Sequence, residues 1–76
     1  MSSSPFLRVS EVAARYGFSS WTIHEKARLG LIPHRKLAGG SSPLLFIDAE
    51  LTAYENGAEL EVTETPGGGR VVRPIA

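Results

Sequence analysis

Apolar residues in the first part of the chain recur at the spacing of a short amphipathic helix. Ser10 is placed to cap the N-terminus of this helix with its hydroxyl group, and Gly17 is placed to end it in a left-handed turn. The residues before Phe6 show no such periodicity, so residues 1–5 are expected to be a flexible N-terminus. The inward face of the helix is formed by three residues: Val12, Ala13 and Tyr16.

A second helix is expected to follow after a very short turn. Ser19 is its predicted N-cap, the helix is predicted over residues 20–29, and Gly30 is its stop. Phe18, just before the cap, is expected to pack on Ile23 as a hydrophobic staple. The outward positions of this helix, three and four residues apart, hold Trp21, His24, Glu25 and Arg28.

Turn-forming residues then replace the helical pattern. Pro33 prevents a further helix, and the sequence AGGSSP at residues 38–43 separates two β-type segments, residues 32–37 and 44–47. These segments predict a two-stranded hairpin with a long tip. Four aromatic side chains are expected to fill the core among the helices and this hairpin: Tyr16, Phe18, Phe46 and Tyr54.

The last part of the chain contains one more helical segment and a second turn. A helix is predicted from Asp48, as its N-cap, to about Asn56. Residues 58–76 alternate apolar and polar positions on each side of TPGGG, which indicates a hairpin. A frayed acidic tail is the alternative, because Pro74 limits the last strand to a sheet edge. Four apolar residues here either complete the core or offer a strand edge to another protein: Val62, Val71, Val72 and Ile75.

Composition narrows the class of protein further. A chain of 76 residues has room for one domain with a thin margin of stability. It contains no cysteine, which excludes disulfides, thiol nucleophiles and thiolate metal sites. No stretch approaches the length needed to cross a bilayer, and the N-terminus lacks a basic start followed by an apolar run. We therefore expect no membrane partner and a cytoplasmic location.

Charge is separated along the chain although its total is zero. Residues 1–47 hold six Lys and Arg against two Glu, a net charge of +4, while residues 48–76 hold two Arg against six acidic residues, a net charge of −4. A basic front and an acidic back result, and a basic front suits contact with nucleic acid. A chance distribution of charge on a small protein is the alternative, so the sequence motifs have to decide between these two interpretations.

Residues with catalytic potential lack the required spacing. Neither AGGSSP nor TPGGG contains the lysine and hydroxyl residue that a P-loop requires. His24 and His34 lie ten residues apart with no third ligand nearby, so a metal site is not expected. The carboxylates of Glu59, Glu61 and Glu64 fall in a segment expected to be solvated rather than tuned for acid-base chemistry. We predict that the protein is not an enzyme and has no cofactor.

The order of these elements resembles that of the excisionase and MerR-type winged helix-turn-helix family. LRVSEVAARYGFSSWTI (residues 7–23) is similar to the family's opening, RLGLIP (28–33) to its junction between second helix and wing, and LLFIDAELTAYENG (44–57) to its returning strand and closing helix. The resemblance covers residues 6–57. It implies a small α+β winged helix-turn-helix domain with three short helices and a basic β-hairpin wing, followed by the C-terminal hairpin or tail of residues 58–76.

The resemblance also implies a double-stranded DNA partner. In this family the second helix enters the major groove, and the wing touches an adjoining minor groove or the backbone. The DNA-binding residues are then expected to be Ser19, Ser20, Trp21, Thr22, His24, Glu25, Arg28, His34, Arg35, Lys36, Ser41 and Ser42. For Trp21, packing of half the indole ring on a neighbour is an equal alternative. Because cations are few, cooperative self-association on DNA or binding beside another protein is expected.

Three functions are compatible with these expectations. The first is an excisionase-like accessory factor for DNA recombination, a recombination directionality factor that binds and bends DNA and contacts an integrase. The second is a small transcriptional regulator of the same fold. The third is a protein-interaction module that docks a partner through the acidic third helix and tail; Glu25 on the outward face of the second helix and the neutral total charge favour it.

Overall fold

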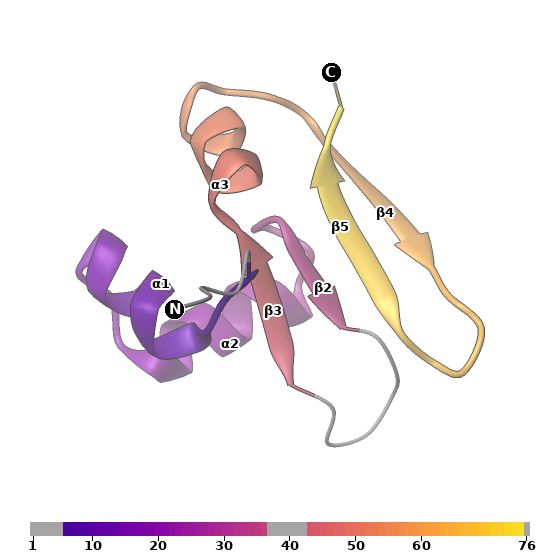
Figure 1. The fold of residues 1–76 in the computed structure, drawn as a ribbon, viewed down its shortest axis with the longest axis horizontal. Helices are drawn as coiled ribbons and strands as arrows, with labels where there is room; N and C mark the ends of the chain where they lie inside the picture. The colour runs from indigo at the N-terminus through magenta and orange to yellow at the C-terminus, as the bar shows by residue number, and fades with distance from the viewer. Residues whose placement is uncertain (1–5, 37–42, 76) are drawn as a thin grey trace, which may run out of the picture.

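The computed structural model describes residues 6–36 and 43–75, which form a small α+β fold (Figure 1). The helices in this part of the chain are α1 (Val9–Tyr16), α2 (Ser20–Arg28) and α3 (Asp48–Glu55). The strands are β1 (Phe6–Leu7), β2 (His34–Lys36), β3 (Leu44–Ile47), β4 (Leu60–Glu64) and β5 (Arg70–Pro74). They form one sheet in the order β1-β3-β2-β5-β4, and each neighbouring pair is antiparallel.

Helix α1 begins earlier than the position of Ser10 predicted. Its N-cap is Arg8, which has extended backbone geometry, and the backbone N–H of Arg8 donates to Oε1 of Glu11 at 2.9 Å. The prediction of a Ser10 cap is therefore wrong, because Val9 is already helical and the Glu11 carboxylate satisfies the helix start instead. Gly17 ends the helix as predicted, with a φ of 74°.

The start of α2 was predicted correctly. The side-chain oxygen of Ser19 accepts a hydrogen bond from the backbone N–H of Thr22 at 3.1 Å. The placement of Phe18 in the core is wrong, since this side chain is 44% exposed. Its ring instead stacks on Tyr16, with centroids 6.1 Å apart, and lies 5.4 Å below the Lys26 ammonium. The short turn between the helices thus leaves the ring on the outer surface.

Helix α3 also begins without the predicted cap. Asp48 is its first helical residue, and the preceding Ile47 makes no side-chain capping bond. The Asp48 carboxylate is directed elsewhere, since its Oδ1 accepts from Nη1 of Arg15 at 2.6 Å. The helix ends at Glu55, with Asn56 as its C-cap, close to the predicted end.

The hydrophobic core joins both helices of the N-terminal pair to α3 and the sheet. Phe46 is fully buried at its centre, as predicted, while Tyr16 and Tyr54 pack against it half-buried. The buried members of this cluster are Val12, Ala13, Ile23, Ala27, Ile32, Phe46 and Leu51. The inward residues predicted for α1 and α2 therefore lie where the helical spacing placed them, with Tyr16 at the margin.

The C-terminal segment forms the predicted hairpin, but its last strand is not at an edge. Strand β5 lies between β2 and β4, so the edge position inferred from Pro74 is wrong. The bond from the Ile75 N–H to the Glu59 carbonyl, 2.8 Å long, makes the neighbouring pair of Leu60 and Pro74 a non-hydrogen-bonded one. On the other side of β5, pairing with β2 stops at His34 and Val72, so Pro74 lies beyond the end of β2. The missing N–H of proline therefore removes no ladder bond.

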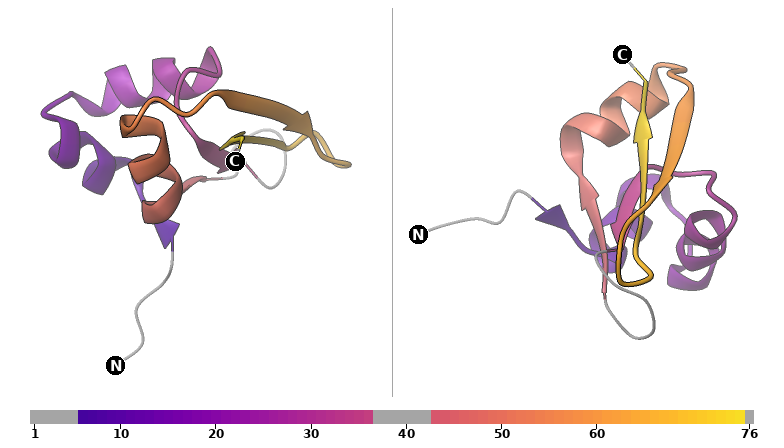
Figure 2. Two further views of the ribbon diagram at one scale, coloured as in Figure 1. Left: turned by 90° about the horizontal axis from the view of Figure 1, so that it is seen from above. Right: turned by 90° about the vertical axis from the view of Figure 1, so that its right-hand side faces the viewer.

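Figure 2 shows α2 and α3 separated by the strands of the sheet. The surface of α2 and the acidic surface of α3 consequently face different directions. Side chains alternate between the two faces along β2 and β5, so the charged residues of each strand divide between the α2 side and the α3 side of the sheet.

Candidate nucleic-acid interface

The residues predicted to contact DNA from α2 do lie on its outer side. Trp21 is 71% exposed, and Ser20, His24 and Arg28 are also exposed. The half-buried alternative for the Trp21 ring is therefore not what the structure shows. Ser19 is exposed as well, but its hydroxyl group is already bonded to the backbone and hydroxyl group of Thr22. The first turn of α2 thus offers an exposed aromatic ring beside helix-start amide groups.

Glu25 and Arg28 form an ion pair along the outer side of α2. Oε1 of Glu25 lies 2.7 Å from Nη2 of Arg28. The Arg28 guanidinium lowers the pKa of Glu25, and the carboxylate raises the pKa of Arg28. The Arg28 side chain remains 65% exposed, so it stays accessible while it is held by Glu25.

The three basic residues of β2 do not all face the same side of the sheet. His34 and Lys36 face the α2 side, where both border the groove described below, whereas Arg35 faces α3. Alternation of side chains along a strand produces this division. The sequence-based grouping of His34, Arg35 and Lys36 into one cationic wing surface is therefore wrong, and only Lys36 remains available on the side of α2.

His34 is a core residue rather than an exposed cation. It is 1% exposed, its Nδ1 lies 2.9 Å from the carbonyl oxygen of Ile32, and its ring lies 6.4 Å from that of Phe46. Burial lowers the pKa of His34 below its ordinary value of 6.5, and the positive charges of Arg70 and Lys36 act in the same direction. The neutral ring donates its Nδ1–H to the carbonyl group of Ile32.

This burial predicts a pH-dependent stability. An unfolded His34 binds a proton near pH 6.5 and a folded one only at lower pH, so the free energy of unfolding falls as the pH decreases below about 6.5. We expect His34→Gln to flatten this dependence between pH 7 and pH 5 in urea denaturation. The variant His24→Gln, at an exposed histidine, is the matched control and keeps the wild-type slope. Equal slopes in all three proteins would contradict the assignment.

Arg70 makes a contact with α2 that sequence reasoning missed. It lies opposite Lys36 in the β2–β5 pair, and its Nη2 donates to the carbonyl oxygens of Ala27 and, at 3.1 Å, Arg28. These are carbonyl groups at the C-terminal end of α2, where a cation is favourable. Arg70 thus ties the C-terminal hairpin to α2. More than forty residues separate it from α2, so no local signal could have revealed this contact.

An open groove of about 810 Å³ runs between α2, β2, the start of β3 and the turn that joins β4 to β5. Its charged lining is mixed: the cations of Arg28, Lys36 and Arg70 face the carboxylates of Glu25 and Glu64. Because Arg28 and Arg70 already have partners, Lys36 supplies the unpaired positive charge among these described residues. Ser41 and Ser42, predicted at the tip of the β2–β3 hairpin, lie outside the described residues.

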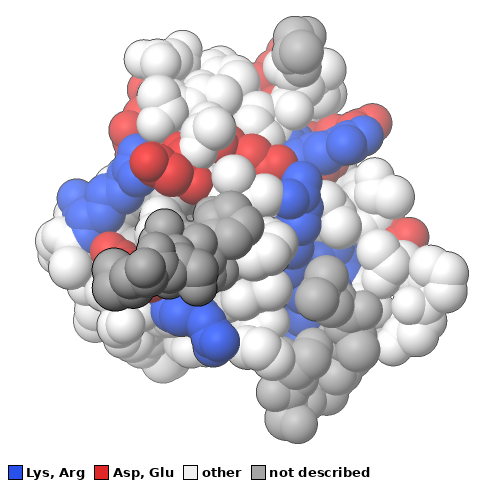
Figure 3. Space-filling model, in the orientation of Figure 1, with Lys and Arg blue, Asp and Glu red and all other residues white. Residues whose placement is uncertain are grey.

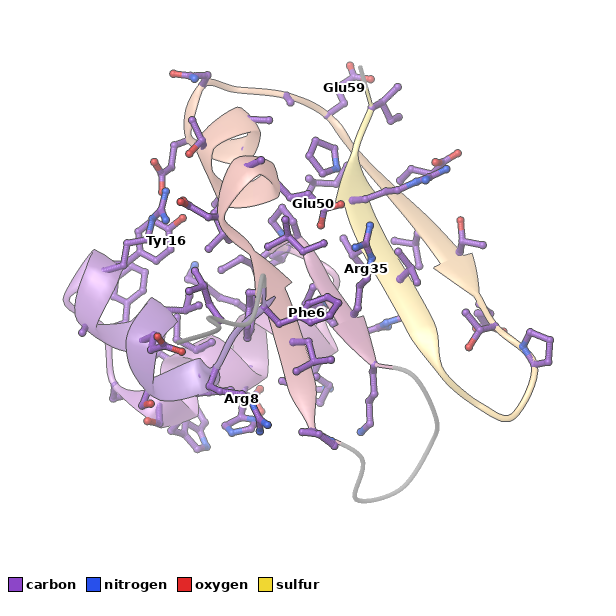
Figure 4. All side chains as sticks on the ribbon, viewed as in Figure 1. Phe6, Arg8, Tyr16, Arg35, Glu50 and Glu59 are labelled. Carbon is purple, nitrogen blue, oxygen red and sulfur yellow. The ribbon has the colours of Figure 1, made fainter. Side chains whose placement is uncertain are left out.

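Most other arginines are held by carboxylates on the α3 side of the sheet. Figure 3 shows blue and red side chains in contact on this face, and Figure 4 shows Arg35 directed toward Glu50. Arg35 lies 2.6 Å from Glu50, and Arg73 lies 3.4 Å from Glu61. In the part of the chain that the structure describes, the cations without a carboxylate partner are Arg8, Lys26, Lys36 and Arg70, of which Arg70 instead donates to backbone carbonyl groups.

Arg15 joins α1 to α3 through two carboxylates. Its guanidinium lies 2.6 Å from Asp48 and 2.9 Å from Glu55, and the hydroxyl group of Tyr16 also donates to Glu55. The bonds from Arg15 and Tyr16 lower the pKa of Glu55, while burial and the bond to Glu55 raise the pKa of Tyr16. This cluster stabilises the packing of two helices and withdraws Arg15 from the basic front inferred from the sequence.

No group of three or more metal-binding side chains is found within residues 6–36 and 43–75. None of the helices in these ranges is long and apolar enough to span a membrane. Comparison of the chain with protein-family models, curated proteins and solved structures finds no match.

Proposed function

We propose that this protein binds double-stranded DNA through the α2–β2 surface, which consists of the outer side of α2 (Ser20, Trp21, His24 and Arg28) and Lys36 of β2. One observation carries the proposal: an exposed helix, joined to its predecessor by a short turn, stands beside an unpaired lysine on the adjacent hairpin. This arrangement suits a winged helix-turn-helix, in which α2 is the recognition helix and the β2–β3 hairpin is the wing.

Each side chain of the α2–β2 surface has a suitable chemistry. The hydroxyl group of Ser20 and the amide groups at the start of α2 suit a phosphate oxygen. His24 and Arg28 can donate to acceptor edges of bases, with guanine as the preferred partner of arginine. Trp21 presents an apolar face that fits a thymine methyl group or a sugar. Lys36 suits the phosphate backbone, which positions the protein without reading the sequence.

Within DNA binding, we propose an excisionase-like role as an accessory factor that binds repeated sites, bends the duplex and contacts an integrase. A small transcriptional regulator would use the same surface. The two roles differ in the target, since an accessory factor requires repeated sites near recombination ends. Mapping bound fragments of the source genome by sequencing would separate them.

Lys36 is expected to contribute to the salt dependence of DNA binding. Binding to a mixed-sequence duplex, followed by fluorescence anisotropy over a salt series, is expected to weaken with salt, and Lys36→Ala should reduce the salt slope by about one. Arg73→Ala is the matched control, because it removes one cation from the α3 side of the sheet. An unchanged slope in Lys36→Ala, or an equal change in Arg73→Ala, would remove β2 from the interface.

The ion pair on α2 is expected to limit the affinity for DNA. Glu25→Gln should free the Arg28 guanidinium and remove a negative charge from the groove, so affinity for mixed-sequence DNA is expected to rise by about threefold to tenfold at low salt. Glu59→Gln removes an equal charge away from the groove and should leave affinity unchanged. If Glu25→Gln instead weakens binding, Glu25 acts as an acceptor for cytosine.

The extensive pairing of arginines supports one other candidate, a protein-interaction module. Arg15, Arg28, Arg35 and Arg73 all have carboxylate partners, which leaves a weak positive field for DNA. If neither wild-type protein nor Glu25→Gln binds duplex DNA at low salt, this second candidate takes precedence.

A further inference from the structure

Strand β4 has one paired edge and one open edge among the described strands. It is the last strand of the sheet and pairs with β5 only. Backbone bonds join Glu59 with Ile75 (2.8 Å) at one end of this hairpin and Thr65 with Gly69 (3.0 Å) at the other. Because bonded and non-bonded positions alternate in an antiparallel pair, the odd-numbered residues of β4 bond to β5. The backbone N–H and C=O groups that point to the open edge belong to Leu60, Val62 and Glu64.

Exposed apolar side chains lie beside this open edge. Val62 is 53% exposed, and its Cγ2 is 3.7 Å from the position that a Cβ atom on Gly30 would occupy. Leu29 and Leu31, on either side of Gly30, are 57% and 50% exposed. Proteins usually shield an edge strand flanked by apolar groups, because it offers both backbone bonds and hydrophobic contact to another chain.

We propose that a second copy of this chain covers β4 by forming an antiparallel strand pair centred on Val62. In this register Val62 faces Val62 of the second copy, Leu60 faces Glu64, and Glu61 faces Thr63. All five residues of β4 are paired, the outward backbone groups meet one another, and no like charges lie opposite.

The alternative registers that match outward backbone groups are less favourable. A shift by two residues in one direction places Glu61 opposite its own copy, which is repulsive. The same shift in the other direction brings Pro66, which lacks an N–H group, opposite Leu60. The chain therefore selects the register centred on Val62 by charge and by hydrogen-bonding capacity.

This pairing has a consequence that rests on the proposed function. The two-fold axis of an antiparallel strand pair is perpendicular to the sheet, so both copies keep the same face on the same side. Both α2 helices then lie on one side of a continuous sheet and suit two half-sites related by a two-fold axis. Such a dimer also doubles the number of cations that face the duplex, which offsets the few cations of one copy.

The interface is tested without DNA by sedimentation velocity and equilibrium over a wide range of protein concentration. The wild-type protein is expected to dimerise as its concentration rises. Val62→Lys and Val62→Glu each place like charges opposite on the two-fold axis, and each should weaken the dimer by about tenfold or more. An equimolar mixture of the two variants should restore dimers, which also shows that both variants are folded.

Thr63→Lys is the matched control on the adjacent position. The lysine introduced there would face Glu61 of the second copy, so the dimer should be as stable as the wild-type dimer or more stable. A wild-type protein that stays monomeric at all concentrations overturns the proposal, as does a dimer that persists in Val62→Lys. A dimer that forms but does not bind duplex DNA would retain this interface and remove the proposed function.

Discussion

Replacing Phe46 by alanine is expected to lower the free energy of unfolding by about 3–5 kcal/mol. The side chain is fully buried in strand β3, where it contacts a cluster drawn from all three helices. A domain of this size rarely exceeds about 3–5 kcal/mol of total stability. We therefore expect Phe46→Ala to be largely unfolded at 25 °C when measured by circular dichroism and urea titration.

Phe18→Ala removes the same side chain at a position where sequence reasoning also expected a core residue. Since Phe18 is 44% exposed, this variant should lose less than about 1 kcal/mol. It should remain folded under conditions that unfold Phe46→Ala. Comparable losses in the two variants would mean that Phe18 is packed inside the domain.

The second large effect is expected at the ion pair between β2 and α3. Arg35 and Glu50 have side chains that are 25% and 16% exposed, and Oε1 of Glu50 is buried without a hydrogen-bond partner within the described residues. Arg35→Met leaves the carboxylate without its cation against the sheet, which should cost about 2–3 kcal/mol. Glu50→Leu leaves the guanidinium unpaired and is expected to cost a similar amount.

The double variant Arg35→Met, Glu50→Leu should be nearly as stable as the wild-type protein, because removal of both charges also removes their desolvation cost. Urea denaturation of the four proteins forms a double-mutant cycle. The exposed pair of Arg73 and Glu61 on the same face is the comparison, with an expected coupling below about 1 kcal/mol. Additive losses at Arg35 and Glu50 would show that the pair contributes no coupling.

Local signals in the sequence predicted most of the secondary structure. The Ser19 cap, the left-handed Gly17 and the spacing of Ile23 and Ala27 are determined within a few residues, and each lies as expected. The caps assigned to Ser10 and Asp48 were wrong for two different reasons. Helix α1 already starts at Val9, where the Glu11 carboxylate accepts from the N–H of Arg8, and the Asp48 carboxylate accepts from Arg15 instead. The bond to Arg15 forms only because α1 and α3 meet in the folded structure.

The candidate site was predicted less well than the helices. The exposed positions on α2 follow from helical spacing, whereas the basic run of β2 was treated as one surface. A signal was present there, since alternation along a strand separates Arg35 from both neighbours. No comparable signal existed for Arg70, which reaches α2 only because β5 enters the sheet beside β2. DNA binding itself remains a prediction.

The position of β5 also determines the order in which the parts of the molecule can fold during synthesis. Its neighbour β2 is synthesised more than thirty residues earlier, so β2 has one unsatisfied edge until β5 has left the ribosome. The helix pair α1 and α2 relies on contacts close in sequence and can form first, while the sheet closes last. A nascent chain interrupted before Arg70 therefore exposes the unpaired backbone edge of β2, the kind of surface that makes unfinished proteins prone to aggregation and dependent on chaperones.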